Sequence, residues 1–238
     1  MDNHIISNAV KILAVFAIPA YLINKNAKAA AIKIDKIFKT FLNLQPEISE
    51  IKPDQRVEFL DNDFFKKWTN DVRAMGCDFI CEKLETYKNI KAIHSVWWEP
   101  KNKFFVFSIT NNANEKLNAK FCISKTTQGI VYTLFGGKGS MMSIPGIYRR
   151  EYCDRDIDTR EMIEIYASKL SSFGGSSISH GSSDSYDLIR KDLNEIKREF
   201  KSRTNGIVPI EVLAGYNAKV PKLMIKLIHY HIRNLNHV

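Results

Sequence analysis

The run from Ala9 to Ala31, "AVKILAVFAIPAYLINKNAKAAA", constrains this chain more than any other stretch. Its uninterrupted apolar part, Ile12 to Ile23, would reach only about 18 Å as a helix, whereas a bilayer core is roughly 30 Å thick. Extending the helix back to Ile5 gives about 28 Å and takes in the polar residues Ser7, Asn8 and Lys11. The segment is therefore a short candidate for a membrane span.

Three interpretations of this segment follow, and the favoured one is a membrane anchor over residues 1–24. Lysines that follow a membrane segment tend to remain in the cytoplasm, so the charge pattern predicts a single-pass protein with its N-terminus outside and its C-terminal domain cytoplasmic. The first alternative is a signal peptide, because Ala27-Lys28-Ala29 has the form of a cleavage site and would lead to secretion. The second alternative is an interfacial or buried helix.

Residues 25–54 are expected to form a basic amphipathic helix followed by a linker that contains Pro46 and Pro53. The segment carries five lysines, Lys25, Lys28, Lys33, Lys36 and Lys39, and the last three lie opposite the apolar side chains of the helix. Together with a formal net charge of +9, they favour anionic lipids as a partner. The simpler alternative is a solvated lysine face on a structural helix.

Residues 55–173 are expected to form an α+β domain. A helix over "DNDFFKKWTNDVRAMG" should end in a left-handed conformation at Gly76. Five strand-like segments follow, rich in aromatic and β-branched residues and joined by short connections: "CDFICEKLETY", "IKAIHSVWWEP", "KFFVFSIT", "NAKFCISKT" and "IVYTLFGG". Short connections suit antiparallel neighbours, so the sequence predicts an antiparallel four- or five-stranded meander with flanking helices.

Residues 174–185, "GGSSISHGSSDS", are typical of a linker. Residues 186–238 are expected to be helical and basic. Their first part carries an apolar seam of Tyr186, Ile189, Leu193, Ile196 and Phe200. The predicted fold is thus an α+β domain preceded by an N-terminal apolar helix and followed by a helical C-terminal region.

Familiar chemical motifs are absent from the sequence. Cys77 and Cys81 would lie about 13 Å apart on a strand, with Phe79 between them on the same face, so buried free thiols are expected. "GGKGS", Gly136 to Ser140, lacks the Lys-Ser or Lys-Thr pair of a phosphate-binding loop. The sequence therefore predicts no metal site and no cofactor.

The favoured function is a membrane-tethered binding or accessory protein that engages anionic lipids and another protein. One alternative is an enzyme whose site is dispersed in the sequence, with His94, Tyr148, Arg149 and Arg150 as its first candidates, the last three in a loop. A concave pocket that brings His94 to this loop would favour the enzyme. A second alternative is single-stranded nucleic-acid binding through the aromatic and basic residues around one hairpin: Trp97, Trp98, Lys101, Lys103, Phe104 and Phe105.

Overall fold

The computed structural model describes residues 2–43, 47–87, 90–136, 143–144, 146–172, 180–216 and 221–235. The chain divides into two compact units. One consists of residues 1–43 and 200–238, and the other of residues 44–199.

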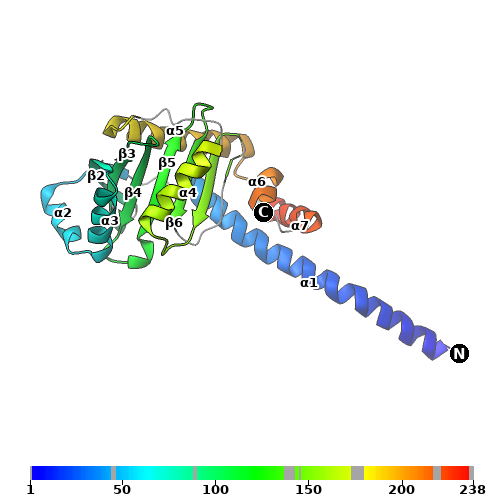
Figure 1. Cartoon of the computed structure of the whole chain (residues 1–238). Coiled ribbons are helices and arrows are strands. Elements are labelled where there is room, and N and C mark those ends of the chain that lie inside the picture. Colours follow the sequence, from blue (N-terminus) through cyan, green and yellow to red (C-terminus); the bar gives the residue numbers. More distant parts are fainter. Residues whose placement is uncertain are drawn as a thin grey trace. The chain divides into compact units, whose positions relative to one another are not determined.

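The unit of residues 44–199 is built on one sheet of seven strands in sequence order, shown in green and cyan in Figure 1. The strands are β1 (Glu47–Glu50), β2 (Asp78–Tyr87), β3 (Ile90–Glu99), β4 (Phe104–Thr110), β5 (Ala119–Lys125), β6 (Val131–Gly136) and β7 (Tyr148–Cys153). Neighbours are antiparallel except β6 and β7, which are parallel. The α+β class is confirmed, but the predicted four or five strands were wrong.

The five predicted strands correspond to β2 to β6, and the two outer strands were missed for different reasons. β1 has four residues and lies between two prolines, inside the range expected to be linker. β7, "YRREYC", carries three charged residues, and its first part was expected to be a loop. It runs parallel to β6, a pairing that usually needs a crossover of a dozen residues or more.

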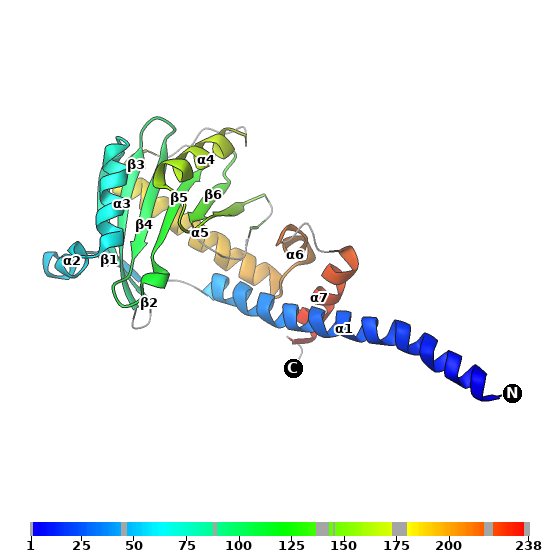
Figure 2. The ribbon, with the colours of Figure 1, turned by 60° about the horizontal axis from the view of Figure 1, so that its bottom comes forward.

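Helices cover both faces of this sheet, as Figures 1 and 2 show. One face carries α2 (Pro53–Leu60), α3 (Asp63–Ala74) and α4 (Thr159–Ser172), and we call it the α3–α4 face. The other face, which we call the α5 face, carries α5 (Ser183–Thr204). A 3-10 turn, η1 (Glu115–Leu117), precedes β5.

The ends of α3 follow from local sequence. The Asn62 side chain accepts a hydrogen bond from the backbone N–H of Phe65 at 3.1 Å and so caps the helix start. Gly76 has a φ of 76° and ends the turn as predicted, a conformation that other residues rarely adopt.

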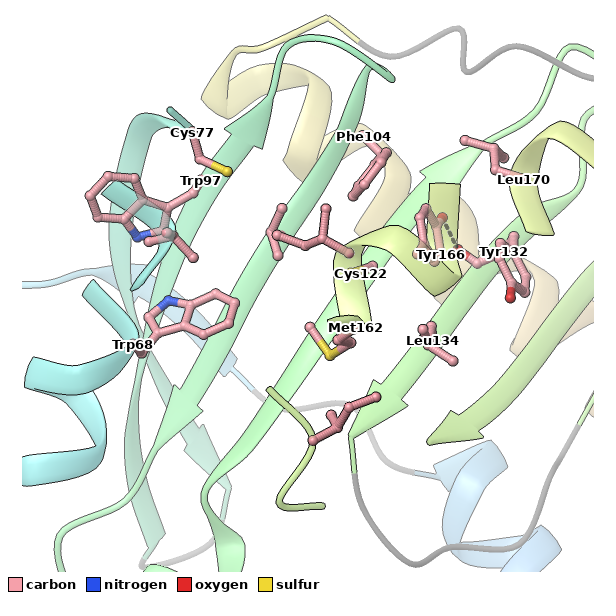
Figure 3. Close-up of a cluster of buried hydrophobic side chains, with 14 residues drawn as sticks. Trp68, Cys77, Trp97, Phe104, Cys122, Tyr132, Leu134, Met162, Tyr166 and Leu170 are labelled. Carbon is pink, nitrogen blue, oxygen red and sulfur yellow. Dashed lines mark hydrogen bonds between the residues drawn. The ribbon is translucent and has the colours of Figure 1, made fainter. Parts of the chain in front are cut away.

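A large cluster of buried apolar side chains lies on the α3–α4 face (Figure 3). Phe104 is fully buried, and its ring centroid lies 4.6 Å from that of Tyr166. The Tyr166 hydroxyl donates to the backbone carbonyl of Tyr132 at 3.0 Å, so this buried polar group is satisfied by the sheet. The other labelled members are Trp68, Cys77, Trp97, Cys122, Leu134, Met162 and Leu170.

A β-bulge decides which side chains of β2 reach the α5 face. Phe79 pairs with Trp97 and Cys81 pairs with Val96, so Ile80 is an extra residue in β2. Since a shift of one residue exchanges the faces of a strand, Cys81, Lys83 and Glu85 come to the α5 face. Phe79 and Cys81 therefore lie on opposite faces, contrary to the expectation, and Phe79 is 53% exposed.

The other unit contains α1 (Asp2–Asn43), α6 (Ile210–Tyr216) and α7 (Lys222–Leu235). α1 packs against α7, and Asn24 hydrogen-bonds to His231 at 2.8 Å. Phe38 packs edge-on against Phe200 with ring centroids 5.9 Å apart. The helical character predicted for the N- and C-terminal regions is confirmed.

The predicted membrane anchor over residues 1–24 is not supported. Among the described residues, no helix combines the length and apolarity that a membrane crossing needs. The physical reason is the one already visible in the sequence: the helix continues through Asn24 and the lysines, and its uninterrupted apolar part is too short. The predicted single-pass topology depended on that span and is likewise not supported.

Candidate functional site

The predicted lipid-binding lysines lie on α1, and four of the five are exposed. Lys25, Lys28, Lys33 and Lys36 are exposed, while Lys39 is half-buried and forms an ion pair with Asp35 at 2.8 Å. The opposite side of the helix is buried through Ala27, Ala31, Ile34, Phe38, Phe41 and Leu42. Over the residues described, the exposed lysines and the buried apolar side chains therefore lie on opposite sides of the helix.

Apolar side chains interrupt this basic face. Tyr21 is 64% exposed, Leu22 is 49% exposed and Ile32 is 50% exposed. Tyr21 and Ile32 belong to a stripe that advances in steps of three and four residues: Tyr21, Lys25, Lys28, Ile32, Lys36 and Lys39. We call Tyr21, Leu22, Ile32 and the four exposed lysines the mixed face of α1.

The enzyme candidate His94 is buried on β3 and faces α5. Its Nε2 is in contact with the Glu85 carboxylate, and its Nδ1 lies 3.4 Å from the Tyr186 hydroxyl. Its ring stacks on Phe107 with centroids 5.6 Å apart. Burial lowers the pKa of His94, so the neutral ring donates from Nε2 to Glu85 and accepts from Tyr186 at Nδ1.

Tyr186 links this pair to a cation on the next turn of α5. Arg190 hydrogen-bonds to the Tyr186 hydroxyl. Burial alone would raise the pKa of Glu85, but the bond from His94 and the charges of Arg190 and Lys197 hold the pKa below its ordinary value. The polar groups thus form one chain, from Arg190 through Tyr186 and His94 to an ionised Glu85.

Tyr148 and Arg150 also lie on the α5 face, on the edge strand β7. Tyr148 is buried, hydrogen-bonds with Arg150 and has a pKa raised by burial. The Arg150 guanidinium lies over the rings of Phe135 and Tyr152, 5.2 Å and 5.3 Å from their centroids. Arg149 is exposed and forms an ion pair with Glu151 on the α3–α4 face, apart from the other two.

The sheet therefore brings three of the four enzyme candidates to one face, but three strands, β4 to β6, lie between β3 and β7. The expectation that Tyr148 to Arg150 form a loop was wrong, because they begin β7. His94 is fully buried and lines neither of the two grooves described here. Within the described part of the chain, neither groove joins His94 to Tyr148 and Arg150.

Sequence reasoning missed the residues of α5 that complete this site. We call Glu85, His94, Arg150, Tyr186, Arg190 and Lys197 the charged cluster. It contains three basic side chains and one carboxylate. Lys197 is buried, and burial, with the charges of Arg190 and Arg150, lowers its pKa to about 8. The one available sequence signal was that Lys197 directly follows Ile196, a member of the predicted apolar seam.

A groove lies beside the charged cluster, between the first two strands and α5. It has a volume of about 600 Å³. Its lining residues are Ile48, Ser49, Glu50, Lys83, Asp187, Arg190, Lys191, Asn194 and Arg198. Arg190 belongs both to this groove and to the charged cluster.

A second groove, of about 540 Å³, lies at the ends of β5 to β7. Its lining includes two basic residues, Lys116 and Arg155, and two acidic ones, Asp154 and Asp156. It therefore carries no net charge. Gly136 also lines it, while Lys138 of the glycine-rich motif lies outside the described residues.

The aromatic residues proposed to stack on nucleic acid are all buried. Trp97 faces the α3–α4 core, and Trp98 faces the opposite way and packs edge-on against Phe105. Phe104 and Phe105 are fully buried. These four side chains therefore offer no stacking surface to a single strand.

The cysteines and the other possible metal ligands are dispersed. Cys77 and Cys122 belong to the core of the α3–α4 face, whereas Cys81 lies near Ser183 on the α5 face. Burial raises the pKa of Cys77 to about 12, which makes it a poor nucleophile. Within the described part of the chain, no three His, Cys, Asp or Glu side chains are grouped to hold a metal ion.

Comparison of the chain with protein-family models, with curated proteins and with solved structures gave no match in any of the three.

Proposed function

We propose that this protein is a binding protein that lies on the surface of anionic membranes through the mixed face of α1. The single observation that carries the proposal is the presence of exposed Tyr21, Leu22 and Ile32 among exposed lysines. A helix face that meets only water has no physical need for three large apolar side chains.

The chemistry of the mixed face suits the interface between lipid headgroups and acyl chains. Lysines near an anionic leaflet contribute about 1 kcal/mol each, and apolar side chains gain further free energy when they enter the interface. Lysine stems can lie along apolar surface while their ammonium groups stay among the headgroups. The proposal needs no membrane span, and it keeps the favoured partner of the sequence analysis.

A co-sedimentation experiment tests this function. The full chain should pellet with vesicles that contain phosphatidylserine and remain in the supernatant with phosphatidylcholine alone. Replacing Lys25, Lys28 and Lys36 with Gln should weaken binding by about 100-fold, the equivalent of about 3 kcal/mol. Raising the salt concentration should weaken it too.

The matched control removes three exposed lysines elsewhere, as Lys66→Gln, Lys67→Gln and Lys101→Gln. This variant has the same net charge as the first and should bind almost as well as the unaltered chain. Equal losses in the two variants would show that only net charge matters and would refute a specific role for α1. The double variant Leu22→Ser and Ile32→Ser should also bind less, with little change in its salt dependence.

A competition experiment separates lipid from nucleic acid. Single-stranded oligonucleotide should fail to displace the full chain from phosphatidylserine vesicles. Displacement at low micromolar oligonucleotide would assign the basic surface to nucleic acid instead. Failure to bind either probe would mean that the lysines are the solvated face of a structural helix.

A further inference from the structure

We propose that the groove between the first two strands and α5 binds a small soluble molecule through its phosphate group. This inference is independent of the role of α1, because every lining residue belongs to the unit of residues 44–199. It assigns a second binding site, of a different ligand class, to the same chain.

The groove carries a surplus of positive charge. Four of its lining residues are basic and two are acidic. The two acids are already engaged with one base: Lys83 forms ion pairs with Asp187 and, at 3.8 Å, with Glu50. Three further cations remain on α5, namely Arg190, Lys191 and Arg198, of which Arg198 lies 3.9 Å from the exposed Glu195.

Helical spacing places these cations along one wall. Asp187, Arg190, Lys191, Asn194 and Arg198 follow one another at steps of one, three or four residues, which is one stripe of a helix. The facing wall is the short edge strand β1 with Lys83 of β2. An anion between the walls would thus meet the cations of α5 on one side and Ser49, beside the paired Lys83, on the other.

Arg190 is the residue best placed to bind a phosphate. It is half-buried, and the Tyr186 hydroxyl holds its guanidinium on the side next to Glu85 and His94. A guanidinium fixed in this way offers two parallel N–H donors to phosphate oxygens and loses less side-chain entropy on binding. Ser49 and Asn194 add uncharged hydrogen-bond donors nearby.

The size and the lining of the groove favour a small polar ligand over a lipid. A volume of about 600 Å³ is within the range of small-molecule sites. Ile48 is the one aliphatic residue among the nine that line it, so acyl chains would find little apolar surface. A soluble phosphate ester therefore fits better than a phosphorylated lipid headgroup, which has the same charged group.

The test uses the full chain labelled with ¹⁵N and titrated with inorganic pyrophosphate at constant ionic strength. The amide signals of residues 48–50 and 187–198 should shift together and give one dissociation constant. Arg190→Gln should raise this dissociation constant at least tenfold. Arg190→Lys should give a value between those of the unaltered chain and Arg190→Gln, because lysine keeps the positive charge but lacks the two parallel N–H donors. Lys191→Gln, at an exposed position that leaves folding intact, should raise it about threefold.

The matched control is Arg160→Gln, which removes an exposed arginine from α4 on the other face of the sheet. Its dissociation constant should equal that of the unaltered chain. Unchanged binding in both Arg190→Gln and Lys191→Gln, or shifts confined to residues outside the groove, would overturn the proposal. So would the opposite ligand preference, in which vesicles with a phosphorylated inositol lipid shift the groove signals and pyrophosphate does not compete.

Each of the two proposals can be refuted without refuting the other. Loss of vesicle binding in the α1 lysine variant should leave the pyrophosphate titration unchanged. Arg190→Gln should leave co-sedimentation with phosphatidylserine vesicles unchanged. If either variant removes both kinds of binding, the groove is not the independent site described here.

Discussion

The α3–α4 face buries Trp68, Phe104 and Tyr166 among other apolar side chains, whereas the α5 face of the same sheet buries His94 and Lys197 beside the half-buried Glu85. Both faces contain aromatic rings in contact and both contain buried charged groups, such as Lys120 and Glu151 on the α3–α4 face. The difference is that the charged groups of the α5 face interact with one another in one cluster. Burying a charged side chain costs free energy unless it is paired, and an apolar side chain of similar size would pack at least as well. The comparison teaches that the α3–α4 face supplies stability and that the α5 face is the place to look for binding.

The largest expected effect comes from the α3–α4 face. Phe104→Ala should lower the free energy of unfolding by about 3–5 kcal/mol, because it opens a cavity beside Tyr166. Urea unfolding followed by tryptophan fluorescence measures this directly, since Trp68, Trp97 and Trp98 all belong to the unit of residues 44–199. Phe79→Ala, at an exposed position, is the control and should cost less than about 1 kcal/mol. Equal losses in the two variants would contradict the core assignment.

The second effect, on the α5 face, comes from Glu85→Gln. The substitution leaves Arg190 and Lys197 without the cluster's carboxylate and weakens the bond from His94, so we expect a loss of about 2–4 kcal/mol at pH 7. Glu161→Gln, at an exposed position on α4, is the control and should change stability little. A loss below about 0.5 kcal/mol in Glu85→Gln would show that the ion pair contributes nothing net.

The same pair predicts an acid dependence. The folded pKa of His94 is lower than the ordinary 6.5, so the unfolded chain binds more protons below pH 6.5 and stability falls as the pH falls. The folded pKa of Glu85 is lower than the ordinary 4.5, so its contribution is present above pH 4.5 and is lost as the pH falls through the folded value. Glu151, on the α3–α4 face, also has a lowered pKa, so the unaltered chain alone cannot assign the effect. The Glu85→Gln variant should lose the part of the dependence below pH 4.5.

Local sequence predicted the α3–α4 face better than the α5 face. The apolar spacing of Met162, Tyr166 and Leu170 and the aromatic and β-branched residues of β4 are short-range signals, and the structure buries both sets of side chains. The charged cluster depends instead on the bulge at Ile80 and on a helix more than a hundred residues further along the chain. Neither produces a periodic pattern, so only tertiary structure could unite Glu85 with Arg190.

A third effect, of opposite sign, comes from Lys197→Met. Burial is the main reason that the pKa of Lys197 falls to about 8 from 10.5, so a charged Lys197 destabilises the folded chain at pH 7. The variant should therefore be more stable by about 1–3 kcal/mol at pH 7. The unaltered chain should gain stability from pH 7.5 to about pH 9.5, because its unfolded state binds more protons there, and the variant should not. A less stable Lys197→Met variant would show that Lys197 has a structural role.

The smallest expected effect tests whether charge at the edge of the α3–α4 face matters. Lys169 of α4 forms an ion pair with Glu151 of β7, but the lysine side chain is 42% exposed and Arg149 also pairs with Glu151. Water screens such a pair, and the remaining arginine keeps the carboxylate neutralised. Lys169→Met should therefore change the free energy of unfolding by less than about 1 kcal/mol in the same urea measurement. The double variant Arg149→Met and Lys169→Met sharpens the comparison, because it leaves Glu151 without either cation. If the double variant loses as much as Glu85→Gln, the α3–α4 face also depends on buried charge, and the contrast between the two faces is wrong.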